Sequence, residues 1–207
     1  MIYSTLHTEG ASILIWEITE SESELIKMLS NFDVYEPEFK QLRTNKRKFE
    51  FLAARIALNI LATHEVVVGY SSEGKPYCVD NSLKISISHS GSWVVVMAHP
   101  TCEVGIDIEV PTDRFLKLYQ RFLNKTEQKS LFDANDLRKV QLAWSAKEAL
   151  YKIIGNEAVN FDKQLEVMDF TVDNEGVFKG IHTLTGKEYT LYYSIIEAFN
   201  LVYCIDN

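Results

Sequence analysis

The chain has 207 residues, enough for one large domain or two small ones. Its hydrophobic fraction of 46% and aromatic fraction of 12% are typical of a soluble core, and no apolar run reaches the length of a membrane span. The net charge of −8 argues against a nucleic-acid partner. Three widely spaced cysteines indicate a reducing compartment, and the N-terminus lacks the pattern of a signal peptide, so we expect a cytoplasmic protein.

The first part of the chain predicts one strand and two helices. Residues 11–18, ASILIWEI, alternate in the manner of a strand. Residues 21–32 begin with serine and acids, which favour a helix N-terminus. From about 37 to 62, apolar residues recur at helical spacing, and we expect one long helix there.

The middle of the chain predicts strands joined by tight turns. The segment VVVGYSSEGKPYCV predicts a strand and then a turn, because glycine and proline interrupt it. Residues 83–90 and 92–99 are two strand-like runs that meet at Gly91, which predicts a hairpin. Residues 105–110, GIDIEV, alternate apolar and acidic side chains and predict a strand with one polar face.

The last part of the chain predicts two helical regions and a meander. The stretch RFLKLYQRFLNKTEQKSLF is helical in pattern, with a break near Asn124. Residues 136–155 predict a long helix that ends at Gly155. The remaining tail predicts an antiparallel meander with turns at 174–176 and 185–187.

Two pairs of segments resemble each other. AARIALNIL aligns without gaps with SAKEALYKI, and SISHSGSWVVVMA is similar in pattern to SIIEAFNLVYCI. Each half of the chain therefore runs from a helix into a closing hairpin. This pattern predicts an α+β protein built as a pseudo-twofold duplication, with each half an antiparallel sheet packed on a long helix. We place the two halves at 1–103 and 104–207.

The predicted strand GIDIEV carries two acids on one face. Asp107 and Glu109 point the same way, about 7 Å apart at their base. This face could be solvated, with lysines on neighbouring strands offsetting the charge. Alternatively, the two carboxylates supply hard oxygen ligands at a spacing that Mg²⁺ can bridge. The motif alone does not decide between these hypotheses.

Two further features suggest phosphate chemistry. Residues 40–55 concentrate basic side chains, which suggests a local anion site, although a solvated helix face accounts for part of them. On the predicted helix 136–155, Trp144, Glu148 and Lys152 are spaced four residues apart and share a face. Trp144 fits a packing role. Glu148 and Lys152 could form a surface ion pair, or they could contribute to a phosphate site.

The order of four short motifs resembles one enzyme family. GKP (74–76), SHSG (88–91), GIDIE (105–109) and WSAKEALYK (144–152) follow the pattern of the 4′-phosphopantetheinyl transferases. The chain is most similar to their monomeric, pseudo-twofold, surfactin-synthetase-activating type, with all motifs in order between about 40 and 155.

The resemblance implies transfer of the phosphopantetheine arm of coenzyme A to a serine of an apo carrier protein. Adenosine 3′,5′-bisphosphate is released, and Mg²⁺ is required. We therefore expect a holo-carrier-protein synthase that acts as a monomer. Its partners would be coenzyme A and an acyl or peptidyl carrier protein, without nucleic acid or membrane.

The resemblance assigns roles to the acids and one lysine. Asp107, Glu109 and Glu148 would be metal ligands, and Glu148 is also the candidate base. Lys152 would contact the pyrophosphate and would form the catalytic pair with Glu148. Whether Glu148 is base, ligand or both stays open, as does Mg²⁺ against Mn²⁺. Lys147 either pairs with an acid or touches the substrate.

The resemblance also implies a binding site for coenzyme A. His89 would bind a phosphate, unless it only caps the hairpin, and Lys75 with its backbone neighbours would hold the adenine end. Arg55 would bind the 3′-phosphate, with Arg47 preferred over Arg43 as a second cation. The implied substrate-binding positions are Arg47, Arg55, Gly74, Lys75, Pro76, Ser88, His89 and Lys152.

Two other functions stay open at this point. The chain could bind coenzyme A or a nucleotide without catalysis, or it could be a metal-dependent phosphodiesterase that cleaves coenzyme A without a protein acceptor. The sequence does not identify the carrier protein. Because such carriers are generally acidic, a basic patch should dock them. The candidate patch within residues 110–135 consists of Arg114, Lys117, Arg121, Lys125 and Lys129.

Overall fold

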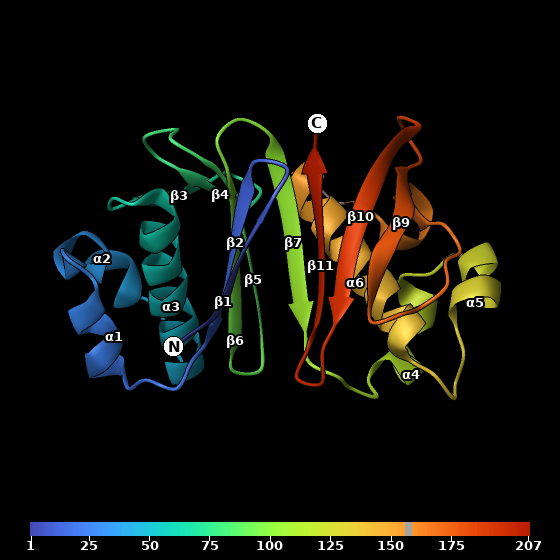
Figure 1. Cartoon of the computed structure of the whole chain (residues 1–207), viewed down its shortest axis with the longest axis horizontal. Helices are drawn as coiled ribbons and strands as arrows, with labels where there is room; N and C mark the ends of the chain where they lie inside the picture. Colours follow the sequence, from blue (N-terminus) through green and yellow to red (C-terminus); the bar gives the residue numbers. More distant parts are fainter. Residues whose placement is uncertain (156–158) are drawn as a thin grey trace. The chain divides into compact units, whose positions relative to one another are not determined.

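The structure is a computed structural model that describes residues 1–155 and 159–207. The described chain divides into two compact units, Met1–Glu103 (unit 1) and Val104–Asn207 (unit 2). Each unit combines helices with antiparallel strand pairs (Figure 1). The predicted α+β class is therefore confirmed.

Unit 1 is built on a four-stranded sheet in the order β1-β2-β6-β5. Its three neighbouring pairs are antiparallel, and β5 and β6 form the hairpin predicted at Gly91. A separate antiparallel ribbon joins β3 to β4. The strands of unit 1 are β1 (Ile2–Thr8), β2 (Ala11–Glu17), β3 (Val68–Tyr70), β4 (Pro76–Cys78), β5 (Lys84–Ser90) and β6 (Trp93–His99).

The helices of unit 1 include one correction to the prediction. They are α1 (Glu22–Met28), η1 (Phe32–Val34), α2 (Glu36–Phe39) and α3 (Asn45–Ala62). The single helix expected from about 37 to 62 is wrong, because α2 and α3 are separate. The Thr44 side chain accepts a hydrogen bond from the Arg47 amide at 3.2 Å and caps a new helix start. The helix expected within 21–32 is confirmed as α1.

Unit 2 is built on a five-stranded sheet in the order β7-β11-β10-β9-β8. The pairs β10–β11, β9–β10 and β8–β9 are antiparallel. Its first strand, β7, begins at the last residue of unit 1. The strands are β7 (Glu103–Glu109), β8 (Leu165–Val167), β9 (Glu175–His182), β10 (Lys187–Ile195) and β11 (Asn200–Asp206).

The helices of unit 2 follow the prediction closely. They are α4 (Phe115–Leu118), η2 (Tyr119–Arg121), α5 (Lys125–Leu131), α6 (Arg138–Ile154) and α7 (Phe161–Gln164). The predicted break falls at Asn124, whose side chain caps α5. The long helix α6 ends at Gly155, which adopts the left-handed conformation at φ 62°.

The structure contains two strands that were not predicted, and it contradicts one predicted turn. β1 was not expected, and it lies at a sheet edge where most of its residues are exposed, so it has no buried face. The short strand β8 was not expected either. The turn predicted at 174–176 is wrong, because β9 already begins at Glu175 and pairs with β8. The turn predicted at 185–187 is confirmed between β9 and β10.

Each unit has its own hydrophobic core between its sheet and its long helix. In unit 1, α3 packs against β2 and β6, and Leu52 and Val96 belong to one buried cluster. In unit 2, α6 packs against β11 and β8, and Leu150 and Val202 belong to another. A twofold relation between the units stays a prediction. Among the described residues, no helix combines the length and the apolar character needed to cross a membrane.

Candidate active site

The two acids of β7 are buried. Asp107 is 4% exposed and Glu109 is 9% exposed. A solvated strand face would leave both carboxylates in water, so that explanation of the alternating pattern is wrong. Buried carboxylates need hydrogen-bond donors or cations to offset the loss of hydration. The side chains that surround them therefore define the candidate site.

Gly105 allows α6 to approach this strand very closely. A Cβ atom built on Gly105 would lie 2.0 Å from the carbonyl oxygen of Ala149 and 2.9 Å from Cγ1 of Ile153. Any side chain at this position would collide with the helix backbone, so only glycine fits. The short distance between strand and helix brings Lys152 within reach of Asp107.

Cationic and indole donors from unit 2 hold the two carboxylates. The Lys152 ammonium donates to the Asp107 carboxylate at 2.9 Å and to the backbone carbonyl of Ile106 at 2.7 Å. The Trp144 indole nitrogen donates to Glu109 at 3.0 Å, and the Arg114 guanidinium also donates to Glu109. Trp144 thus has a polar contact in addition to the packing role that the sequence suggested.

Glu148, on α6, has a strongly raised pKa. Its burial and the nearby Asp107 carboxylate raise the pKa of Glu148 to about 7, while Lys152 opposes the shift. Glu109 raises the pKa further, and Arg114 lowers it. A carboxylate that titrates near neutral pH can both accept and return a proton under cellular conditions. Perturbed acids of this kind concentrate at functional sites.

The three acids were predicted to bind Mg²⁺. Their donor chemistry fits, because carboxylate oxygens are the ligands that Mg²⁺ prefers. In the part of the chain that the structure describes, however, no three His, Cys, Asp or Glu side chains stand together in the arrangement of a metal site. Asp107 and Glu109 instead contact Lys152 and Arg114. The assignment of metal ligands therefore stays a prediction.

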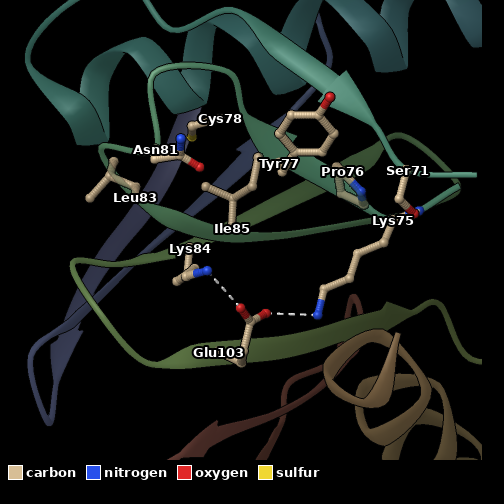
Figure 2. A pocket seen from close by; sticks show the side chains of 10 residues that line it. All are labelled: Ser71, Lys75, Pro76, Tyr77, Cys78, Asn81, Leu83, Lys84, Ile85 and Glu103. Atoms are coloured by element: carbon tan, nitrogen blue, oxygen red, sulfur yellow. Dashed lines mark hydrogen bonds and ion pairs between the residues drawn. The ribbon is translucent and has the colours of Figure 1, made fainter. Parts of the chain in front are cut away.

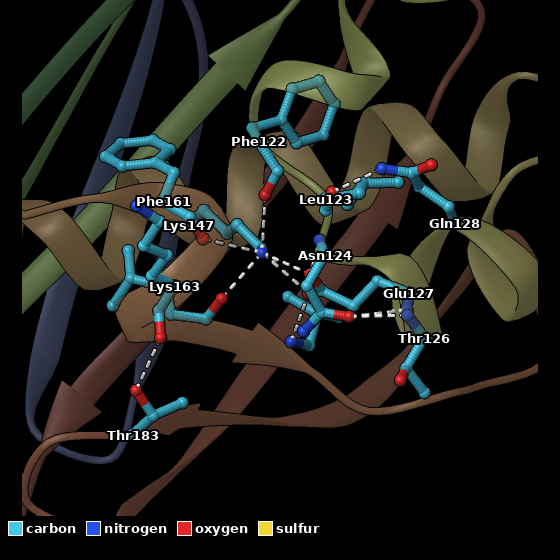
Figure 3. A network of polar contacts seen from close by, with 12 residues as sticks. Phe122, Leu123, Asn124, Thr126, Glu127, Gln128, Lys147, Phe161, Lys163 and Thr183 are labelled. Carbon is cyan, nitrogen blue, oxygen red and sulfur yellow. Dashed lines mark hydrogen bonds and ion pairs between the residues drawn. The ribbon is translucent and has the colours of Figure 1, made fainter.

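Lys147 lies in the interior of unit 2, as Figure 3 shows. Its side chain is fully buried, and its ammonium group lies 2.7 Å from the Glu127 carboxylate, which is 1% exposed. It also donates to the backbone carbonyls of Phe122, Phe161 and Leu165 at 2.7 to 2.9 Å. Burial lowers the pKa of Lys147, and the charge of Glu127 opposes that shift. Of the two roles left open by the sequence, the structure supports the structural pair with an acid.

In unit 1, Arg47 and His89 are in contact although they lie far apart in sequence. A nitrogen of the Arg47 guanidinium is 2.7 Å from Nε2 of His89, and Nδ1 of His89 is 3.2 Å from the Glu50 carboxylate. Because arginine only donates, Nε2 accepts and the ring proton lies on Nδ1, toward Glu50. Ser88, the preceding residue on β5, is 7% exposed.

Gly74 and Lys75 lie in the turn between β3 and β4, and Pro76 is the first residue of β4. Gly74 has φ 82°, a left-handed conformation that glycine adopts without strain. The Lys75 amide donates to the Ser71 side chain at 3.2 Å, and the Ser71 amide donates to the Lys75 carbonyl at 3.0 Å. Lys75 and Pro76 line a cavity of about 220 Å³ in unit 1 (Figure 2). Glu103 also lines this cavity.

Arg55 occupies a different environment from an open phosphate site. It is 2% exposed, and its guanidinium lies over the Phe51 ring at 3.8 Å. It donates to Glu38 at 3.2 Å and to the Tyr70 hydroxyl at 3.0 Å. A 3′-phosphate would therefore have to displace the Glu38 carboxylate. The predicted phosphate contact of Arg55 stays a prediction.

Comparison with known proteins finds a family match in the second half of the chain. Residues 103–204 match the model of the "4′-phosphopantetheinyl transferase superfamily". The match contains β7 and α6, and so it contains all three acids and Lys152.

Proteins similar to this chain carry names that agree with this match. A "Phosphopantetheinyl transferase" of Thraustochytrium sp. is 27% identical over 64% of this chain and 57% of its own length. The "L-aminoadipate-semialdehyde dehydrogenase-phosphopantetheinyl transferase" of Mus musculus is 26% identical over 58% of this chain and 46% of its own. The "4′-phosphopantetheinyl transferase AcpT" of Salmonella typhi is 28% identical over 54% of this chain and 62% of its own length. The chain thus spans about half the length of these relatives.

The structure brings some of the predicted site residues together and adds others that the sequence did not assign. Asp107, Glu109, Glu148 and Lys152 form one group in unit 2, joined by Arg114, which the sequence did not assign to the reacting centre. In unit 1, Arg47 joins His89, while Lys75 and Arg55 have separate surroundings. Sequence reasoning also missed Glu127, Lys84 and Glu103. A buried lysine needs an acidic partner, which could have pointed to Glu127. The two residues are 20 positions apart, however, so no local sequence pattern links them.

Proposed function

We propose that this protein transfers the 4′-phosphopantetheine group of coenzyme A to a serine of an apo carrier protein and releases adenosine 3′,5′-bisphosphate. The observation that carries this proposal is the position of Glu148. Its pKa is raised to about 7 by burial and by Asp107, and it lies within the segment that matches the transferase superfamily. A group that titrates near neutral pH suits a general base.

In the proposed reaction, the Glu148 carboxylate accepts the proton of the serine hydroxyl. The serine oxygen then forms a bond to the phosphorus of the pantetheine phosphate, and the bond from that phosphorus to the bridging oxygen of the pyrophosphate breaks. Lys152 offsets negative charge on the pyrophosphate. A divalent cation held by Asp107, Glu109 and Glu148 would add charge neutralisation when bound.

The nucleotide part of coenzyme A is proposed to bind residues of unit 1. The Arg47 guanidinium, which is 61% exposed and lies next to His89, provides a cation that suits a phosphate group. Lys75 lines a cavity with apolar walls, which suits a planar base beside a charged group.

The carrier protein is proposed to dock on the helices that follow β7. This region contributes five basic side chains, all exposed, on α4, η2, α5 and the residue before α4. Exposed cations attract an acidic partner and accelerate association, although the whole chain has a net charge of −8. The five residues are Arg114, Lys117, Arg121, Lys125 and Lys129.

Mass spectrometry of a panel of apo carrier proteins after incubation with coenzyme A and Mg²⁺ tests the proposal. We expect a mass gain of one phosphopantetheine group on at least one carrier, and no gain with Asp107→Ala. Asp173→Ala, which removes an exposed acid from the same unit, should keep full activity. Binding of coenzyme A without transfer would indicate a non-catalytic binding protein. Release of the bisphosphate without a carrier would indicate a phosphodiesterase.

A further inference from the structure

One carboxylate lies between two lysines at the cavity of unit 1 (Figure 2). The Lys75 ammonium is 2.7 Å from Glu103, and the Lys84 ammonium is 3.0 Å from the other oxygen of the same carboxylate. The three side chains come from the β3–β4 turn, from β5 and from the start of β7. They are 23%, 48% and 36% exposed, respectively, so a ligand from solvent can reach all three.

The cavity beside these charges has mostly apolar walls. Pro76, Cys78, Leu83 and Ile85 line it, together with polar side chains such as Asn81. Its volume of about 220 Å³ is below that of a typical site for a whole drug-sized ligand, which is about 300 to 1,000 Å³. The cavity therefore suits one uncharged end of a larger ligand, whose anionic part would meet the lysines.

The carboxylate is ionised when no ligand is bound. Burial disfavours the charged form of Glu103, but hydrogen bonds from Lys75 and Lys84 outweigh it and hold the pKa of Glu103 below its ordinary value. Two lysines and one glutamate give the cavity lining one net positive charge. Half-exposed ion pairs of this kind are weak, so a stronger anion can replace the carboxylate. A phosphate group offers more oxygen acceptors and more negative charge than a carboxylate.

We propose that Glu103 is a built-in competitor for the anionic ligand of this cavity, and that a phosphate group of the ligand takes its place between Lys75 and Lys84. Weakly bound monoanions would not displace Glu103, whereas a ligand with several phosphate charges and an apolar end would. Lys84 is then a second cation of the ligand site beside Lys75. Only the identity of the ligand, coenzyme A, rests on the proposed function.

The test compares Glu103→Gln with wild type by titration calorimetry, in a metal-free buffer of low salt. Glutamine keeps the size and the hydrogen-bonding capacity of the side chain but removes the charge. Coenzyme A and inorganic pyrophosphate should bind about three- to tenfold tighter to this variant, because the weak ion pairs no longer compete. Adenosine, which has no phosphate, should change less than twofold. Glu188→Gln removes the same charge from an exposed position on β10 and should change nothing.

A second pair of variants shows whether the gain acts through Lys84. Lys84→Met should weaken pyrophosphate binding, and Glu103→Gln should then give a smaller improvement in the Lys84→Met background, because only the pair with Lys75 remains. Unchanged or weaker binding of both anions to Glu103→Gln, at an unchanged melting temperature, would overturn the proposal. An equal gain for adenosine, or an undiminished gain in the Lys84→Met background, would also overturn it.

The two proposals fail in different ways. Suppose that wild type binds pyrophosphate but not coenzyme A, and that Glu103→Gln binds pyrophosphate more tightly. The competitor role of Glu103 is then supported, and the proposed transferase function is contradicted because its substrate does not bind. If coenzyme A binds and its phosphopantetheine group is transferred, but Glu103→Gln gives no gain in affinity, the competitor role of Glu103 is wrong and the proposed transferase function stands. If neither probe binds to any variant, the cavity is not an anion site and the competitor is wrong.

Discussion

Replacing Lys147 by methionine should destabilise unit 2 strongly. Methionine keeps the length and the apolar stem of the side chain but removes the ammonium group. Glu127 would then remain 1% exposed without its cation, and three backbone carbonyls would lose a donor. Removal of one partner from a buried ion pair costs about 3–5 kcal/mol. This is a large part of the stability of a typical domain, about 5–15 kcal/mol.

Urea unfolding followed by circular dichroism and tryptophan fluorescence measures this loss. Lys163→Met removes an exposed lysine from the same unit and should change the free energy of unfolding by less than about 0.5 kcal/mol. Adding Glu127→Gln to Lys147→Met should recover part of the loss, because the uncompensated charge disappears. Glutamine can still accept the amide hydrogen bond that Val167 donates at 2.8 Å. A loss below about 1 kcal/mol for Lys147→Met, or strictly additive losses, would refute the ion-pair reasoning.

Three further variants test other parts of the site. Glu148→Gln should reduce transfer by about 10²- to 10⁴-fold, and an unchanged rate would remove the proposed base. Burial and Asp107 raise the pKa of Glu148 from 4.5 to about 7. The favourable contribution of Glu148 to the free energy of unfolding is therefore complete below about pH 4.5 and disappears as the pH rises through 7. Denaturation at several pH values should therefore show Glu148→Gln gaining up to about 3 kcal/mol over wild type by pH 8; a pH-independent difference would contradict this. Gly105→Ala should lower stability by at least about 1–3 kcal/mol, and an unchanged melting curve would contradict the clash with Ala149. Arg55→Ala should weaken coenzyme A about 10- to 100-fold more than 3′-dephospho-coenzyme A in calorimetry, whereas equal losses would assign Arg55 to its ion pair with α2.

The sequence predicted the elements that carry regular patterns. Alternation located β7, and the spacing of Trp144, Glu148 and Lys152 placed these side chains on one face of α6, because periodicity reports which face an element buries. The break before α3 was missed, since the cap at Thr44 interrupts an apolar pattern that continues across it.

Contacts between distant segments could not be predicted in the same way. The pairing of Arg114 with Glu109 depends on the course of an irregular segment after β7. Lysine is almost never fully buried, so no sequence pattern placed Lys147 inside the core. Lys84 and Glu103 belong to no motif. Lys84 reaches Glu103 because the β5–β6 register places Lys84 opposite His99, shortly before Glu103 in the chain.

The coordination of Lys147 has a consequence for how unit 2 opens. The four acceptors of its ammonium group belong to two stretches that are well separated along the chain, Phe122 with Glu127 and Phe161 with Leu165. If one segment detaches, a buried charge keeps only part of its partners, so partial opening is unfavourable. These segments should therefore be released together in one cooperative event rather than fray one by one. In native-state hydrogen exchange, their backbone amides would then share a single opening free energy.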